Sequence, residues 1–71
     1  MMDAFKVLKT DSDFLAAALT QSRVAIFELR GDLAGCIVDY GGHVVKWSPI
    51  SVKVSDAYYI RGEFEFRMVL A

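Results

Sequence analysis

The sequence has few of the residues that form disulfides, interrupt secondary structure or accept N-linked glycans. It has one cysteine, one proline and no asparagine among its 71 residues. A single cysteine cannot form an internal disulfide, and without asparagine there is no acceptor for an N-linked glycan. Disulfides are typical of oxidising compartments, so nothing here indicates secretion, and we expect a cytoplasmic protein.

Neither sign of charge predominates. Eight basic and nine acidic residues give a formal net charge of −1. Proteins that bind nucleic acid through its phosphates usually carry a net basic surface, so this balance argues against nucleic acid as a partner. The longest apolar run, residues 14–19, is far too short to span a bilayer, and residues 1–8 lack the apolar run of a signal peptide. We therefore expect no membrane association.

Residues for metal binding or nucleophilic catalysis are scarce. Cys36 and His43 are the only cysteine and histidine, whereas a structural zinc site takes four such ligands. In the hairpin described below they would lie about 13 Å apart, at roughly 3.3 Å per residue, which is too far for proton transfer. Cys36 is then best interpreted as a buried, unreactive residue. The sequence predicts no catalytic residues, no metal site, no cofactor and no enzyme.

Apolar residues, by contrast, are plentiful, at 55% of the chain. A chain of this length makes one domain, residues 1–71, which buries only about 60% of the surface that its unfolded form exposes. Average domains contain about 45–50% apolar residues. The excess of apolar residues over what one small core can bury favours self-association.

The clearest local pattern lies at the end of the chain. There, large apolar side chains occur at alternate positions, with Gly62 in the same series. Because successive side chains of a strand point to opposite faces, this spacing predicts one long strand, with Gly62 at a sharp bend. The intervening residues, Tyr59 and Arg61 among them, would line the mostly solvated face. The apolar series is Tyr58, Ile60, Phe64, Phe66, Met68 and Leu70.

Helix signals occur only near the start of the chain. Residues 10–13 offer N-cap and acidic groups, with Asp11 and Asp13 as capping residues, and strong helix formers follow. A helix is therefore predicted over 12–21. Strands are predicted over 5–9, 23–29, 36–40, 43–47 and 50–54, the second of them apolar on both faces. Both faces of that strand must therefore be buried. The helix could cover one face and the interior of the curved sheet the other, or a second subunit could cover one of them.

Gly41–Gly42 separates two strand-like runs, a spacing typical of a two-residue hairpin. Its register would place Tyr40 opposite His43 and Cys36 opposite Trp47 on one face. Asp39 and Lys46 would form a weak ion pair on the other face.

Together these elements predict an α+β fold. One N-terminal helix packs on a strongly curved, mainly antiparallel sheet of five or six strands, with a small barrel-like, SH3-like shape.

The candidate binding residues are aromatic or basic. An exposed patch at the hairpin would contain Tyr40, His43 and Trp47, with Tyr59 and Arg61 from the final strand, since aromatic side chains with polar tips are favoured at binding surfaces. Alternatively, Trp47 belongs to the core, and Tyr40 and His43 lie at its rim, because a small protein needs its large side chains inside.

Three functions follow in order of preference. The first is a small non-enzymatic interaction protein, such as an adaptor, regulator or inhibitor, that binds another protein or itself. The second is a small-barrel nucleic-acid-binding protein that stacks bases on Tyr40, His43, Trp47 or Tyr59, with Lys46, Lys53 and Arg61 on phosphates. The third is an enzyme whose site is shared between subunits.

Overall fold

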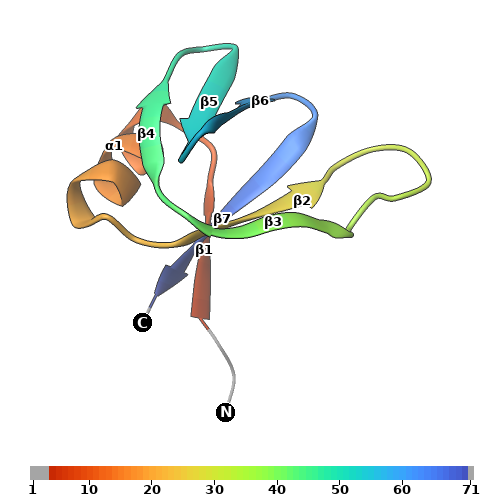
Figure 1. The fold of residues 1–71 in the computed structure, drawn as a ribbon, viewed down its shortest axis with the longest axis horizontal. Helices are drawn as coiled ribbons and strands as arrows, with labels where there is room; N and C mark the ends of the chain where they lie inside the picture. The colour runs from red at the N-terminus through yellow and green to blue at the C-terminus, as the bar shows by residue number, and fades with distance from the viewer. Residues whose placement is uncertain (1–3, 71) are drawn as a thin grey trace.

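The computed structural model describes residues 4–70, which form one helix and seven strands (Figure 1). Residues 1–3, part of the segment considered above for a signal peptide, and residue 71 lie outside the described residues. The one helix of the described part is too short to cross a membrane. In chain order the elements are β1 (Ala4–Leu8), α1 (Asp11–Thr20), β2 (Val24–Glu28), β3 (Ile37–Gly42), β4 (Val44–Trp47), β5 (Ser51–Val54), β6 (Ala57–Ile60) and β7 (Phe64–Leu70).

The strands form two antiparallel sheets. Sheet A has the order β1-β7-β2-β3, and sheet B has the order β4-β5-β6. The predicted α+β class, with one N-terminal helix and antiparallel pairing, is confirmed. The strands number seven rather than five or six, and they divide between two sheets. Neither sheet closes on itself, so the barrel-like, SH3-like shape stays a prediction.

Helix α1 forms because its first turn satisfies its own backbone donors. The hydroxyl of Thr10 accepts the N–H of Asp13 at 3.1 Å. In return, the Asp13 carboxylate accepts the N–H groups of Thr10 and Lys9, at 3.0 and 2.8 Å. This capping box starts the helix within one residue of the predicted position. Gln21, in the left-handed conformation at φ 51°, ends it.

The predicted Gly-Gly hairpin is wrong. Strand β3 pairs with β2, and the chain then passes through His43 into β4, which pairs with β5 in the other sheet. Gly42 is required at this crossing, because a Cβ there would lie 2.7 Å from Cγ1 of Val54 and 2.8 Å from Oγ of Ser55. Gly42 therefore permits a close approach of the two sheets, whereas a Cβ at Gly41 would meet nothing within 4 Å and that glycine instead adopts a positive φ of 98°.

The side-chain pairs expected from that hairpin are wrong as well. Asp39 lies opposite Ile26 of β2, and Lys46 lies opposite Lys53 of β5. The structure accordingly has no ion pair between Asp39 and Lys46, because these residues lie in different sheets.

The long final strand is interrupted. Residues 61–63 form a turn that separates β6 in sheet B from β7 in sheet A. The turn shifts the alternation by one residue, so Tyr59 packs against the core while Tyr58 and Ile60 are exposed. In β7 the predicted alternation holds, with Phe66 and Met68 buried. The chain leaves the extended conformation at this turn and changes sheets, so the alternation of β7 does not continue back into β6, and the sequence pattern concealed this break.

The core lies between the inner faces of the two sheets and one side of α1. Phe14 of α1 meets Phe66 of β7 edge to face, with ring centroids 5.6 Å apart. Strand β2 is buried on both sides, as predicted for a strand apolar on both faces. The buried core residues are Leu8, Phe14, Ala17, Val24, Ile26, Val44, Val52, Val54, Phe66 and Met68.

Cys36 does not belong to this core. Its thiol is free and its side chain is exposed, which contradicts the prediction of a buried cysteine. The prediction relied on the hairpin register, which would have put Cys36 beside Trp47. Instead Cys36 ends the connection 29–36, which projects away from the rest of the fold in Figure 1.

Candidate functional site

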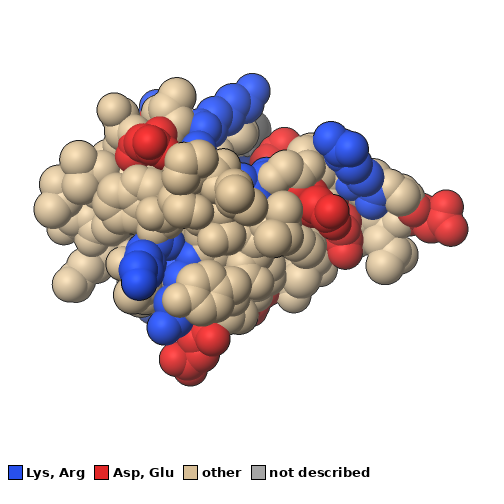
Figure 2. All heavy atoms as spheres, turned by 90° about the horizontal axis from the view of Figure 1, so that it is seen from above, with Lys and Arg blue, Asp and Glu red and all other residues tan. Residues whose placement is uncertain are grey.

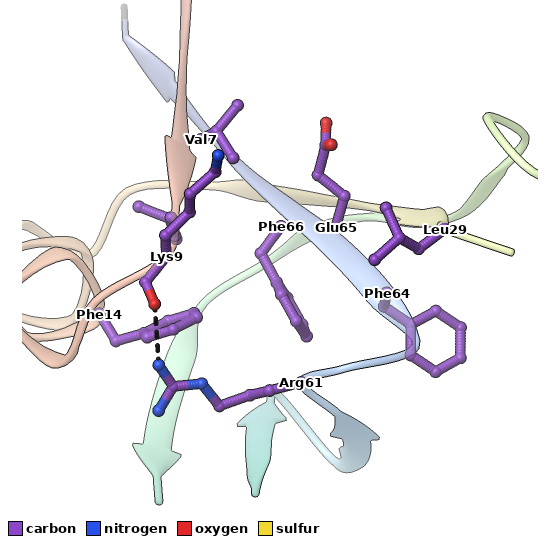
Figure 3. A pocket seen from close by; sticks show the side chains of 9 residues that line it. Val7, Lys9, Phe14, Leu29, Arg61, Phe64, Glu65 and Phe66 are labelled. Carbon is purple, nitrogen blue, oxygen red and sulfur yellow. Dashed lines mark hydrogen bonds between the residues drawn. The ribbon is translucent and has the colours of Figure 1, made fainter. Parts of the chain in front are cut away.

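An aromatic hollow opens where β1 ends, α1 begins and the β6–β7 turn passes (Figure 3). Its volume is about 300 Å³, at the lower end of the range for small-molecule pockets. Its lining includes three phenylalanines and three aliphatic residues, together with three charged residues. The lining residues are Val7, Leu8, Lys9, Phe14, Leu29, Arg61, Phe64, Glu65 and Phe66.

Arg61 closes one side of this aromatic hollow. Its Nη1 donates to Oδ1 of Asp11 at 2.9 Å and to the carbonyl of Ser48 at 2.6 Å, and its Nη2 donates to the carbonyl of Lys9 at 2.9 Å. The guanidinium carbon also lies 4.7 Å from the ring centre of Phe14. Arg61, predicted as a binding residue, thus joins three segments of its own chain, and its fork-shaped donor group suits that task.

Tyr59 lies behind the aromatic hollow rather than on the solvated face. Its ring meets Phe64 and Phe66 edge to face, at centroid distances of 5.4 and 6.3 Å. Its hydroxyl donates to Oδ2 of Asp39 at 3.1 Å. Burial, followed by the hydrogen bond and charge of Asp39, raises the pKa of the Tyr59 hydroxyl.

The other three predicted binding residues do not meet at one site. Tyr40 borders a broad, shallow hollow beside Arg23, at the end of α1. Nδ1 of His43 lies 3.3 Å from the carbonyl oxygen of Ser22. Trp47 is half-buried against the core and lines a small hollow on sheet B. The common face expected for them depended on the hairpin, which does not form.

A second apolar surface is one face of sheet A, here called the outer face. In the strand register, Val7 of β1, Arg67 of β7, and Ala25 of β2 lie in one row with Tyr40. Directly opposed residues share a face, so neighbouring rows follow from the same register. The outer face comprises Phe5, Val7, Ala25, Phe27, Ile37, Tyr40, Glu65, Arg67 and Val69. Its exposed apolar side chains come from the edge strands β1 and β3, whereas Ala25 in β2 is buried and the remaining residues are half-buried.

Sequence reasoning did not identify this outer face, although one signal for it was present. Strand β2 was recognised as apolar on both sides and in need of a second cover. The sequence did not indicate which strands lie beside β2 in the sheet. Its neighbours β7 and β3, and β1 beyond β7, come from other parts of the chain. The alternate residues of β7, including Glu65 and Arg67, were assigned to a mostly solvated face.

Charge is dispersed over the molecule. Figure 2 shows basic and acidic side chains interspersed on the face that it displays, with uncharged surface between them. Within residues 4–70, no three side chains among histidine, cysteine, aspartate and glutamate are grouped so that they could hold a metal ion.

Comparisons of this chain with protein families, with curated proteins and with solved structures found no match.

Proposed function

We propose that this protein is a small, cytoplasmic, non-enzymatic interaction protein that binds a second copy of itself through the outer face of sheet A. The observation that carries the proposal is the exposure of large apolar side chains on that face. Ile37 is 55% exposed, Tyr40 52% and Phe5 44%. Large apolar side chains exposed on one face of a small protein, around a charged centre, are consistent with an interaction site.

The charges of the outer face favour a second copy over an unrelated partner. At its centre, Glu65 and Arg67 form an ion pair, and the Arg67 guanidinium lies 4.2 Å from the ring centre of Phe27. A two-fold interface uses the same patch twice, so residue i meets residue j and j meets i. A patch with one acid and one base at its centre is complementary to itself in such an arrangement. The net charge of −1 adds little repulsion between copies.

The face is a better docking surface than the neighbouring edge of the sheet. Strand β3 forms one edge of sheet A, but its pairing with β2 contains two register shifts. Such bulges interrupt the regular row of donors and acceptors that an added strand would need. Side-chain packing between two outer faces does not need that row.

The first test is sedimentation velocity over a range of protein concentrations. We expect a reversible dimer, and Ile37→Asp on the outer face is expected to weaken it at least tenfold. Ile50→Asp is the matched control, because Ile50 is also exposed but lies between β4 and β5. A wild-type protein that stays monomeric at every concentration would contradict self-association. Equal effects of the two substitutions would contradict the choice of face.

Charge reversal gives a sharper test of the two-fold arrangement. Glu65→Arg and Arg67→Glu each place like charges at the centre of the interface and should weaken the dimer. The double variant restores opposite charges and should recover it. Each single change also removes the ion pair within one chain, so circular dichroism and urea unfolding must show that the variants are folded. Failure of the double variant to recover the dimer would contradict the arrangement.

A further inference from the structure

The outer side of sheet B carries two lysines that face each other across neighbouring strands. Lys46 of β4 lies directly opposite Lys53 of β5, which lies directly opposite Tyr58 of β6. Opposed residues project from the same face of a sheet, so the three side chains form one row. The row lies on the side away from the core, because the next row, which contains the buried Val52, points inward.

Two like charges directly opposite each other destabilise a sheet. In the described part of the chain, neither ammonium group has a carboxylate within 4.0 Å. Lys6, by comparison, has Asp13 at 3.7 Å. Sheet B therefore carries a local concentration of positive charge, although the whole chain is slightly acidic.

A hollow of about 130 Å³ is lined by Lys46, Trp47, Ser48, Ser51 and Tyr58. Lys53 does not line it but lies directly opposite two of the lining residues, Lys46 and Tyr58. Since one water takes up about 30 Å³ in the liquid, the space suits a single small oxyanion. Ser51 brings a hydroxyl group to its wall. Tyr58 is 62% exposed, so much of its ring is open to a planar group, although Nζ of Lys53 lies 5.5 Å from the ring centre.

From this arrangement we infer that the outer side of sheet B binds a phosphate monoester carried on a planar ring. The two ammonium groups would neutralise the doubly charged phosphate, and lysine acts as a point charge toward such groups. The ring of the ligand would stack on Tyr58, as bases do on exposed aromatic side chains. This site is separate from the outer face of sheet A, and the inference does not depend on self-association.

The test is a titration followed by two-dimensional amide NMR at constant ionic strength. Inorganic phosphate and phenyl phosphate are the small probes, and a single-stranded oligothymidylate is the polymeric one. We expect saturable shifts in β4, β5 and β6, with phenyl phosphate binding about tenfold more tightly than inorganic phosphate because of stacking. Tighter binding of the oligonucleotide than of phenyl phosphate would identify a strand as the source of the phosphate. The reverse would identify a small molecule.

Lys46→Gln and Lys53→Gln should each weaken binding at least tenfold. Arg30→Gln, which removes one positive charge from the exposed connection between β2 and β3, should leave it unchanged. The lysine variants should also be more stable than the wild type in low salt without ligand, because they remove the repulsion. Absence of saturable shifts in the wild type, or equal binding by the lysine variants, would overturn the proposal.

Discussion

The hydroxyl of Tyr59 donates a hydrogen bond to Oδ2 of Asp39 at 3.1 Å and thereby joins β6 of sheet B to β3 of sheet A. These strands belong to different sheets, and the two residues are 20 positions apart in the chain. The bond requires the protonated hydroxyl. A phenolate has no proton to donate, and its negative charge would be repelled by the neighbouring carboxylate. The contact therefore makes the packing of the two sheets sensitive to pH.

The protein should lose stability in alkali as Tyr59 loses its proton. Its pKa is raised in the folded state, so its contribution is complete below the pKa of the unfolded chain, about 10. That contribution is lost as the pH rises through the folded pKa. Tyr59→Phe should cost about 0.5–1.5 kcal/mol at neutral pH for the lost hydrogen bond. It should also flatten the fall in stability above pH about 10, as measured by urea unfolding. Tyr58→Phe, at an exposed hydroxyl, should follow the wild type, and parallel profiles for the wild type and Tyr59→Phe would contradict the assignment.

Arg61→Lys should destabilise the fold although it keeps the charge. One ammonium group cannot reproduce the donations from Arg61 to Asp11, to the Ser48 carbonyl and to the Lys9 carbonyl. We expect a loss of about 1–3 kcal/mol in the free energy of unfolding, measured in urea. Arg30→Lys, in the exposed connection between β2 and β3, should change it by less than about 0.5 kcal/mol. Similar results for the two variants would show that Arg61 does not hold the three segments together.

Gly42→Ala should be the more harmful of two otherwise similar glycine substitutions. The added methyl group would meet Val54 and Ser55 at the crossing between sheets, and relieving that overlap should cost about 1–3 kcal/mol. A Cβ at Gly62 would meet nothing within 4 Å, and its φ is outside the left-handed region. Gly62→Ala should therefore be neutral or stabilise by about 0.4–1 kcal/mol. The melting temperatures of both variants, measured by thermal unfolding, test this difference. Equal values would contradict the close approach of Val54 and Ser55 to Gly42.

The capping box should make the start of α1 sensitive to acid. The N–H groups of Lys9 and Thr10 hold the pKa of the Asp13 carboxyl below its usual range. Its contribution is therefore present above the unfolded pKa of about 4 and is lost as the pH falls through the folded pKa. Asp13→Asn should reduce the loss of stability on acidification, as followed by circular dichroism. Asp32→Asn, in the exposed connection between β2 and β3, is the control, and it should leave the acid transition unchanged.

How far the structure can be predicted from the sequence varies by element. Helix α1 was predicted to within one residue at its start, because its cap and its helix formers act within a single turn of chain. Strand β2 and the later half of the final strand followed from composition and alternation. The binding residues were harder to predict, because Tyr40, His43 and Trp47 were grouped through an assumed pairing rather than through any property of their own.

Local sequence determines backbone preference and periodicity, and in this protein it decided which segments are helical or extended. Strand partners depend on contacts between distant segments, and only the tertiary structure decided them. Gly41–Gly42 is compatible with a tight turn, but the role of Gly42 came from the approach of Val54 and Ser55, 12 and 13 residues further along the chain. Likewise, Tyr59 points inward, contrary to the prediction, because β6 pairs with β5 so that Tyr59 lies opposite the buried Val52. The outer face of sheet A exists only because β1, β7, β2 and β3 come together, and no single stretch of sequence encodes such a surface.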